Sequence, residues 1–405
     1  MAQFLMSLPY YVVSYTILIG LVITVHELGH FLAAKAVGTK IDRFSIGFGK
    51  AIFRRTDRAG VEWRIGVVPI GGYVRFAGDD NAASIPDQED LDAMRRDLLE
   101  RVGPAELRRY YHFKPLWQRA MISVAGPVAN FVLAVAIFTS LLLAFGQPMA
   151  TPRVGLVVAG SPAQTAGFRV GDVVVRANGT PVASTEDVRQ IIILRSGVPI
   201  TFEVKRGGQL VDLVATPRRG PVKDAIGHVH QLGQIGVGFS ALPSDEWVQR
   251  YNPIQALGAG VKRTADVVST TVFYLQRMLS GHETADQLAG PLGMAQMTGA
   301  IEKQTAEASG NLSTFLFLGG INLLQMAAMI SVGIGFVNLM PIPVLDGGHL
   351  LFYAYEAVAR RPLAAKVQAA GYRVGLALVL GLMLFATWND LQRLRVFNFL
   401  GGLHS

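Results

Sequence analysis

Cysteine is absent from the 405 residues of the sequence, and charged residues are scarce. Without cysteine, the chain can have no disulfide framework, no thiolate zinc site and no thiol nucleophile. Asp, Glu, Lys and Arg make up only 16% of the residues, against about a quarter in soluble domains. The net charge of +8 comes from scattered basic residues without interleaved aromatics. We therefore expect basic cytoplasmic loops of a membrane protein rather than a nucleic-acid partner.

Four long stretches of the chain carry no charged residue at all. A membrane-spanning helix needs about 20 apolar residues. The first three stretches exceed that length, and the fourth reaches it when residues 369–372 are included. We predict four membrane spans, the alternative being large buried helices of a soluble enzyme. The uncharged stretches are residues 1–25, 120–152, 308–345 and 374–389.

The first stretch could be mistaken for a signal peptide. It has no basic residues before its hydrophobic part, and it continues into His26 and Glu27 without a small-residue cleavage site. We therefore predict a retained helix. The segments at 35–58 and 360–373 are basic, which by the positive-inside rule places both in the cytoplasm. Both chain ends and the segment 147–312 would then lie on the opposite side, although two arginines after the last span are evidence against this orientation.

The segments between the spans differ in pattern. Residues 43–78 alternate apolar and polar side chains, most clearly at Val61–Ile65, which predicts strands beside the membrane. Residues 81–112 are polar and helical in character and are typical of a solvated linker. From 245 to 307 the spacing of apolar residues favours amphipathic helices on the outer membrane face, and a soluble connector is the alternative.

Residues 150–240 contain the turn and cap signals of a small β-rich domain. Gly160-Ser161-Pro162-Ala163 opens a short helix, Gly171-Asp172 forms a turn, Asn178-Gly179 is a strong hairpin signal, and Ser184 caps a second helix. This order of elements resembles a PDZ domain of the bacterial protease type. The resemblance implies that an extended peptide binds by adding a strand to the domain.

The string His26-Glu27-Leu28-Gly29-His30 carries the chemistry. Residues four apart share one face of a helix, so both imidazoles converge on one point, as two nitrogen ligands of zinc require. Glu27 beside them can take a proton from a metal-bound water, whose pKa the metal lowers to about 7. The alternative is a helix end with three hydrated side chains, but ionisable groups at the end of an uncharged span are costly unless they are paired or bind metal.

A catalytic zinc needs a third protein ligand, and Asp346 is the best candidate. It is the first charged residue after the third uncharged stretch and follows Pro341 and Pro343, which break a helix where the backbone lines a cavity or is buried in protein. A helix-capping role for Asp346 is the alternative reading. His349 is a rival ligand.

The combination of HExxH in the first span, a late NxxPxPxLDGG and a PDZ domain between spans two and three resembles the site-2 protease family of intramembrane zinc metalloproteases. Within that family the chain is most similar to the bacterial regulator-of-sigma-E proteases. The resemblance implies zinc held by His26, His30 and Asp346, with Glu27 as general base and acid. It also implies that Asn338, Pro341 and Asn130 contact substrate, the alternatives for the two asparagines being helix breaking and packing.

The resemblance further implies single-span membrane substrates such as an anti-sigma factor or remnant signal peptides. It implies the bacterial inner membrane, a periplasmic PDZ domain and an active site near the cytoplasmic side. The best-known relatives have two PDZ domains, whereas we find one. Two other functions are considered. The first is a membrane-anchored, metal-binding PDZ adaptor without proteolytic activity, which the presence of Glu27 disfavours. The second is a metal-ion transporter, which the lack of several intramembrane carboxylates disfavours.

The sequence thus predicts a polytopic α-helical membrane protein with about four transmembrane helices, a membrane-associated β-region and one extracytoplasmic PDZ domain. The expected segments are 1–37 (first transmembrane helix with HExxH), 38–80 (β-region), 81–116 (cytoplasmic linker), 117–147 (second transmembrane helix), 150–240 (PDZ domain), 241–310 (amphipathic helices), 311–349 (third transmembrane helix with NxxPxPxLDGG) and 366–390 (fourth transmembrane helix).

Overall fold

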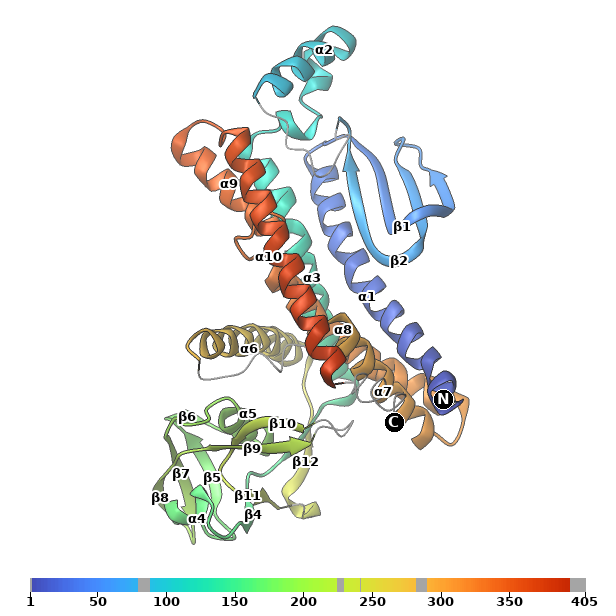
Figure 1. Cartoon of the computed structure of the whole chain (residues 1–405). Coiled ribbons are helices and arrows are strands. Elements are labelled where there is room, and N and C mark those ends of the chain that lie inside the picture. The colour runs from blue at the N-terminus through green and yellow to red at the C-terminus, as the bar shows by residue number, and fades with distance from the viewer. Residues whose placement is uncertain (1, 79–87, 224–228, 241, 282–289, 394–405) are drawn as a thin grey trace, which may run out of the picture. The chain divides into compact units, whose positions relative to one another are not determined.

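The computed structural model describes residues 2–78, 88–223, 229–240, 242–281 and 290–393 (Figure 1). The chain divides into two compact units, each described by itself. Unit 1 comprises residues 1–138, 259–268 and 288–405, and unit 2 comprises residues 139–258 and 269–287. Residues 79–80 of the predicted β-region and residues 81–87 of the predicted linker lie outside the described residues.

Within the described ranges, four helices are long and apolar enough to cross a membrane, which confirms the predicted number of spans. The third predicted span, 311–349, is divided, because a helix ends at Asn338 and a new one begins at Asp346. Pro341 and Pro343 lie between them, where each removes a backbone N–H donor. The four helices are α1 (Ala2–Ala36), α3 (Leu116–Phe145), α8 (Leu312–Asn338) and α10 (Ala365–Arg393).

Small residues allow the spanning helices of unit 1 to approach closely. A Cβ atom at Gly29 of α1 would lie 2.7 Å from Cβ of Ala129 on α3 and closer still to the Ala125 carbonyl oxygen. On the other side of α3, a Cβ at Gly335 of α8 would lie 3.1 Å from the Pro127 carbonyl oxygen. Membrane helices associate through such small-residue contacts, and here they place α3 against both α1 and α8.

The β-region of unit 1 consists of β1 (Ile41–Thr56) and β2 (Glu62–Phe76), both of them bent, beside α1 (Figure 1). Residues Arg43–Ile46 have partners on two sides, Gly72–Arg75 on one and Glu62–Ile65 on the other. Glu62–Gly66 also pairs with Ala51–Thr56. The segment Gly72–Phe76 therefore forms an edge of this sheet, next to α1.

The remaining helices of unit 1 connect its spans. Asp390 of α10 is fully buried and accepts hydrogen bonds from the backbone N–H groups of Gly290 (3.1 Å) and Gly293 (2.8 Å) at the start of α7. A carboxylate at a helix N-terminus satisfies the free N–H groups there. The other helices of this group are α2 (Gln88–Leu107), η1 (Tyr111–Phe113), α7 (Pro291–Ala308) and α9 (Asp346–Ala359).

Unit 2 is built on an antiparallel sheet in the order β6-β5-β7-β8. Its core contains Val154, Val188, Ile200, Phe202 and Val204, all essentially inaccessible to solvent. The elements that form this core are β4 (Val154–Val157), α4 (Pro162–Ala166), β5 (Val173–Ala177), α5 (Thr185–Ile193), β7 (Ile200–Arg206), β8 (Gln209–Ala215) and β11 (Val237–Phe239). The edge strand β6 (Thr180–Pro181) is exposed.

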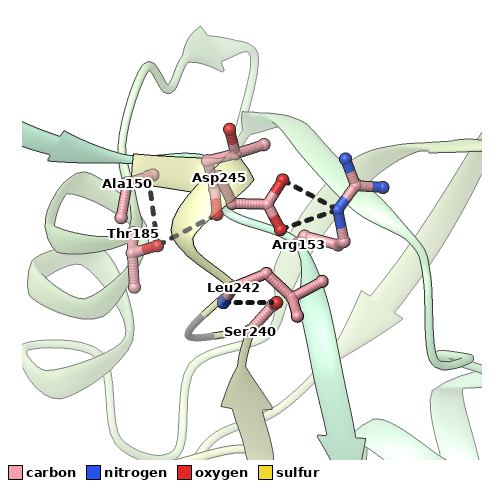
Figure 2. Close-up of polar contacts among 7 residues, drawn as sticks. Ala150, Arg153, Thr185, Ser240, Leu242 and Asp245 are labelled. Carbon is pink, nitrogen blue, oxygen red and sulfur yellow. Dashed lines mark hydrogen bonds and ion pairs between the residues drawn. The ribbon is translucent and has the colours of Figure 1, made fainter. Parts of the chain in front are cut away.

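The two ends of unit 2 are joined to each other. Arg153 donates to both carboxylate oxygens of Asp245, at 3.1 and 2.9 Å, and Thr185 donates to the carbonyl of Ala150 at 3.2 Å (Figure 2). The Arg153–Asp245 ion pair fastens the chain entering unit 2 to the chain leaving it, and the Thr185 bond ties the entering chain to α5. Further elements of unit 2 are β3 (Gln147–Ala150), β9 (Arg218–Lys223), β10 (Val229–Gln234), η2 (Pro243–Asp245) and β12 (Glu246–Gln249), and α6 (Pro253–Leu279) runs through both units.

A buried ion pair stabilises the sheet of unit 2. Arg206 donates from Nε to Oδ1 of Asp172 and from Nη2 to its Oδ2, both at 2.7 Å, and Asp172 is 1% exposed. Burial raises the pKa of Asp172, but the hydrogen bonds from Arg206 and from the N–H of Arg169 outweigh it and hold the pKa below its ordinary value. The pair therefore stabilises the fold above the ordinary Asp pKa of about 3.9, and its contribution is lost as the pH falls through the lower, folded-state pKa.

Arg206→Met should destabilise unit 2 by about 3 kcal/mol, because a buried carboxylate loses its partner. Hydrogen exchange of the β5–β8 amides in the full chain at neutral pH measures this as faster exchange, and the difference from the wild type should shrink in acid. Arg189→Met is the matched control, since Arg189 is exposed on α5. Equal protection in both variants would show that the ion pair does not stabilise this sheet.

Candidate metal centre

His26 and His30 lie one turn apart on α1 and face α3. Their Nε2 atoms are 3.2 Å apart. The Nδ1 atom of His30 lies 2.8 Å from the backbone carbonyl of Ile122, and Nδ1 of His26 lies 3.2 Å from the Asn130 side chain. Each imidazole is therefore held by its Nδ1 atom while its Nε2 atom points to a common space, as is usual for histidines that bind a metal.

Asp346 reaches the same space from the first residue of α9. Its Oδ2 atom lies 3.2 Å from Nε2 of His26 and 3.5 Å from Nε2 of His30. The chain turns sharply between α8 and α9 because Gly347 and Gly348 lack side chains. A Cβ atom at Gly348 would lie 2.4 Å from the Cα of Pro343, and one at Gly347 would overlap the carbonyls of the turn.

The three side chains form the one group within the described residues that could hold a metal ion. Their ligand atoms all lie within 4.8 Å of one another. Among the described residues, Oδ2 of Asp346 has no hydrogen-bond donor although it is buried, and a cation would satisfy it. Two imidazoles and a carboxylate are a donor set typical of catalytic zinc, so the residues present fit this metal.

Gly126 of α3 provides the space beside the histidines. A Cβ atom at this position would lie 2.8 Å from Nε2 of His26 and closer still to Nε2 of His30. Any larger residue would therefore occupy the space between the ligand atoms. Gly126 begins the string Gly126-Pro127-Val128-Ala129-Asn130, of which only Asn130 was predicted as a site residue. The role of Gly126 was not predicted from the sequence.

Glu27 lies on α1 between the two histidines in sequence and contacts the β-region. Its carboxylate accepts a hydrogen bond from the backbone of Val74. A Cβ atom at Gly72 would lie 3.0 Å from Cγ of Glu27. The edge segment of the sheet thus runs past the carboxylate, a contact that the sequence did not predict.

The other predicted site residues have different environments. Asn130 is fully buried with its amide against His26. Asn338 is the last residue of α8 and is half-buried, and Pro341 is exposed in the following turn. His349, the rival ligand, is bonded instead through Nε2 to the hydroxyl of Tyr372 on α10, at 2.8 Å.

Comparison with known proteins identifies the family. The model of peptidase family M50 matches residues 14–382. The chain is 48% identical to metalloprotease MmpA of Caulobacter vibrioides over 96% of this chain and 98% of that protein. It is 40% identical to proteins of Rhizobium meliloti and Agrobacterium fabrum whose names include the words zinc metalloprotease, over 97% and 95% of this chain and 99% and 96% of those proteins. The HExxH histidines of α1 and the distant Asp346 lie together in this chain. The chain belongs to peptidase family M50.

Proposed function

We propose that this multi-pass membrane protein is a zinc metalloprotease that cleaves membrane-spanning segments of other proteins. The observation that carries the proposal is the convergence of His26, His30 and Asp346, which come from the first span and from the turn after the third. His26 and His30 lie within the apolar helix α1, where uncompensated ionisable groups are costly. A hydrolytic metal at this point accounts for all three.

The chain's own residues divide the chemistry between them. His26, His30 and Asp346 would hold the zinc, which when bound lowers the pKa of water and polarises a carbonyl group. Glu27 takes a proton from the attacking water and later gives it to the leaving amine. The Val74 backbone contact holds the Glu27 carboxylate in place between these two transfers.

A substrate helix must be unwound before it is cut, because its carbonyl groups are already hydrogen-bonded. The sheet edge Gly72–Phe76 beside Glu27 offers backbone groups that can pair with an extended segment. We propose that Asn338 and Pro341, in the turn before Asp346, bind the opposite side of that segment. Without such partners, exposed backbone groups in a low-dielectric site would be costly.

We propose unit 2 as a PDZ domain that screens or docks candidate substrates. The antiparallel sheet, the short α4 and the capped α5 support this proposal. We propose that the protein lies in the bacterial inner membrane. The basic segments at 35–58 and 360–373 favour an orientation with unit 2 and both termini in the periplasm. The proposed substrates are single-span proteins, such as an anti-sigma factor or remnant signal peptides.

Cleavage of a single-span test protein by the purified chain, with and without a chelator, tests the proposed function. A protease should contain about one zinc per chain and should lose activity on chelation and regain it with added zinc. A metal-binding adaptor would contain zinc without cleaving. A transporter would move zinc across a vesicle membrane, and either of these results would contradict the proposal.

Gly126→Ala should abolish most zinc retention and cleavage, because its methyl group would overlap the Nε2 atoms of both histidines. Metal analysis after purification measures this. Gly333→Ala on α8 is the matched control, since a Cβ there meets no described atom within 4 Å. Full zinc content in Gly126→Ala would show that the ligands do not use this space.

A further inference from the structure

The Asn130 side chain lies beside one of the candidate metal ligands. Its side chain is fully buried, and its Nδ2 atom lies 3.2 Å from Nδ1 of His26. Its Oδ1 atom is buried with no donor among the described residues. Ser331 of α8 donates to the backbone carbonyl of Asn130 at 2.8 Å and does not contact its amide.

The hydrogen bond between His30 and the Ile122 carbonyl shows which ring nitrogen of a metal-binding histidine carries the proton. The Ile122 carbonyl can only accept a hydrogen bond, so in the neutral ring that binds a metal Nδ1 of His30 carries the proton and the Nε2 lone pair is free. With a cation on Nε2 of His26, the proton of that neutral ring must likewise be on Nδ1. The amide nitrogen of Asn130 would then face another donor across 3.2 Å.

A half-turn of the amide about its Cβ–Cγ bond removes this conflict. The oxygen and nitrogen of an asparagine amide are nearly identical in shape, and their assignment follows from the hydrogen-bond network. We propose that Asn130 is a positioning residue, whose Oδ1 accepts from Nδ1–H of His26 and so directs Nε2 to the metal. This inference rests on the proposed function only in requiring a bound metal.

Two substitutions of similar size test whether Asn130 accepts a hydrogen bond from His26 or only fills space beside it. Asn130→Asp keeps an acceptor and loses the donor, whereas Asn130→Leu loses both. We expect Asn130→Leu to bind zinc about 10–100-fold more weakly than the wild type, as for other lost partners of ligating histidines. Asn130→Asp should bind at least as tightly as the wild type. Competition against a chelator, with the full-length protein in detergent, measures both affinities.

Ser331→Ala is the matched control, because Ser331 contacts the backbone of Asn130 and not its amide. Its zinc affinity should stay close to that of the wild type. Wild-type affinity in Asn130→Leu would overturn the inference, as would equal losses in the Asp and Leu variants. Melting temperatures of all variants identify any that fail to fold.

A measurement on the unmodified chain covers the case in which Asn130→Asp does not fold. Long-range proton–nitrogen correlation spectra of the zinc-loaded, ¹⁵N-histidine protein should show the ring proton of His26 on Nδ1. A proton on Nε2 of His26 would overturn the inference. A wild type that binds zinc but cleaves nothing would refute the proposed protease while leaving this test intact, and a wild type that binds no zinc would refute both.

Discussion

Replacing Glu27 with glutamine is expected to lower the cleavage rate by at least about 100-fold while leaving the zinc content unchanged. The amide has the shape of the carboxylate but cannot accept a proton, and general acid–base groups contribute about 10²–10⁴-fold to rates. The three ligand side chains are untouched by this change. The rate is measured on a single-span substrate, together with metal analysis of the same sample.

Glu302→Gln is the matched control for this change. Glu302 is another carboxyl of unit 1 and is 2% exposed on α7, and burial raises its pKa. A neutral amide therefore substitutes for it at little cost, and cleavage should continue. Normal turnover by Glu27→Gln would refute the assigned role, whereas a loss of zinc in that variant would show that Glu27 is a ligand instead.

Asp346→Asn is expected to weaken zinc binding by more than about 100-fold. Loss of a residue that only hydrogen-bonds to a metal ligand costs about 10–100-fold, and Asp346 is expected to bind the metal directly. The amide removes the negative charge that lies within 3.5 Å of both imidazole Nε2 atoms. Chelator competition gives the affinity, and activity should return only at high added zinc.

Asp212→Asn provides the comparison, because Asp212 is an exposed aspartate on β8 of unit 2. It should bind zinc as the wild type does. Unchanged zinc affinity in Asp346→Asn would remove Asp346 from the ligand set and would leave His349 to be tested next.

The parts of the site that the sequence predicts are those set by local geometry. The spacing of His26 and His30 places both rings on one helix face whatever surrounds them. Asp346 could be chosen because prolines and glycines break the apolar pattern around it. Zinc as the metal follows from this residue set, and the relatives' names agree with it.

Contacts between distant segments were not predictable in the same way. The position of Val74 beside Glu27 depends on how two bent strands pair, and residues Arg43–Ile46 have partners on both sides. The hairpin of β9 and β10 was also missed, because Gly220, Pro221 and Gly233 interrupt its alternation. The contact of Asn130 with His26 depends on the depth of α3 against α1, which no periodicity encodes.

The glycine inside the histidine pentapeptide cannot be replaced without moving a helix. Gly29 has no room for a methyl group, since α3 passes directly over it. The fourth position of the pentapeptide therefore accepts only glycine in this packing, although Gly29 neither binds the metal nor takes part in the reaction. A side chain at Gly29 would push α1 away from α3 at the level of His26 and His30, so the distance between these helices limits the sequence of the pentapeptide as well as its chemistry does.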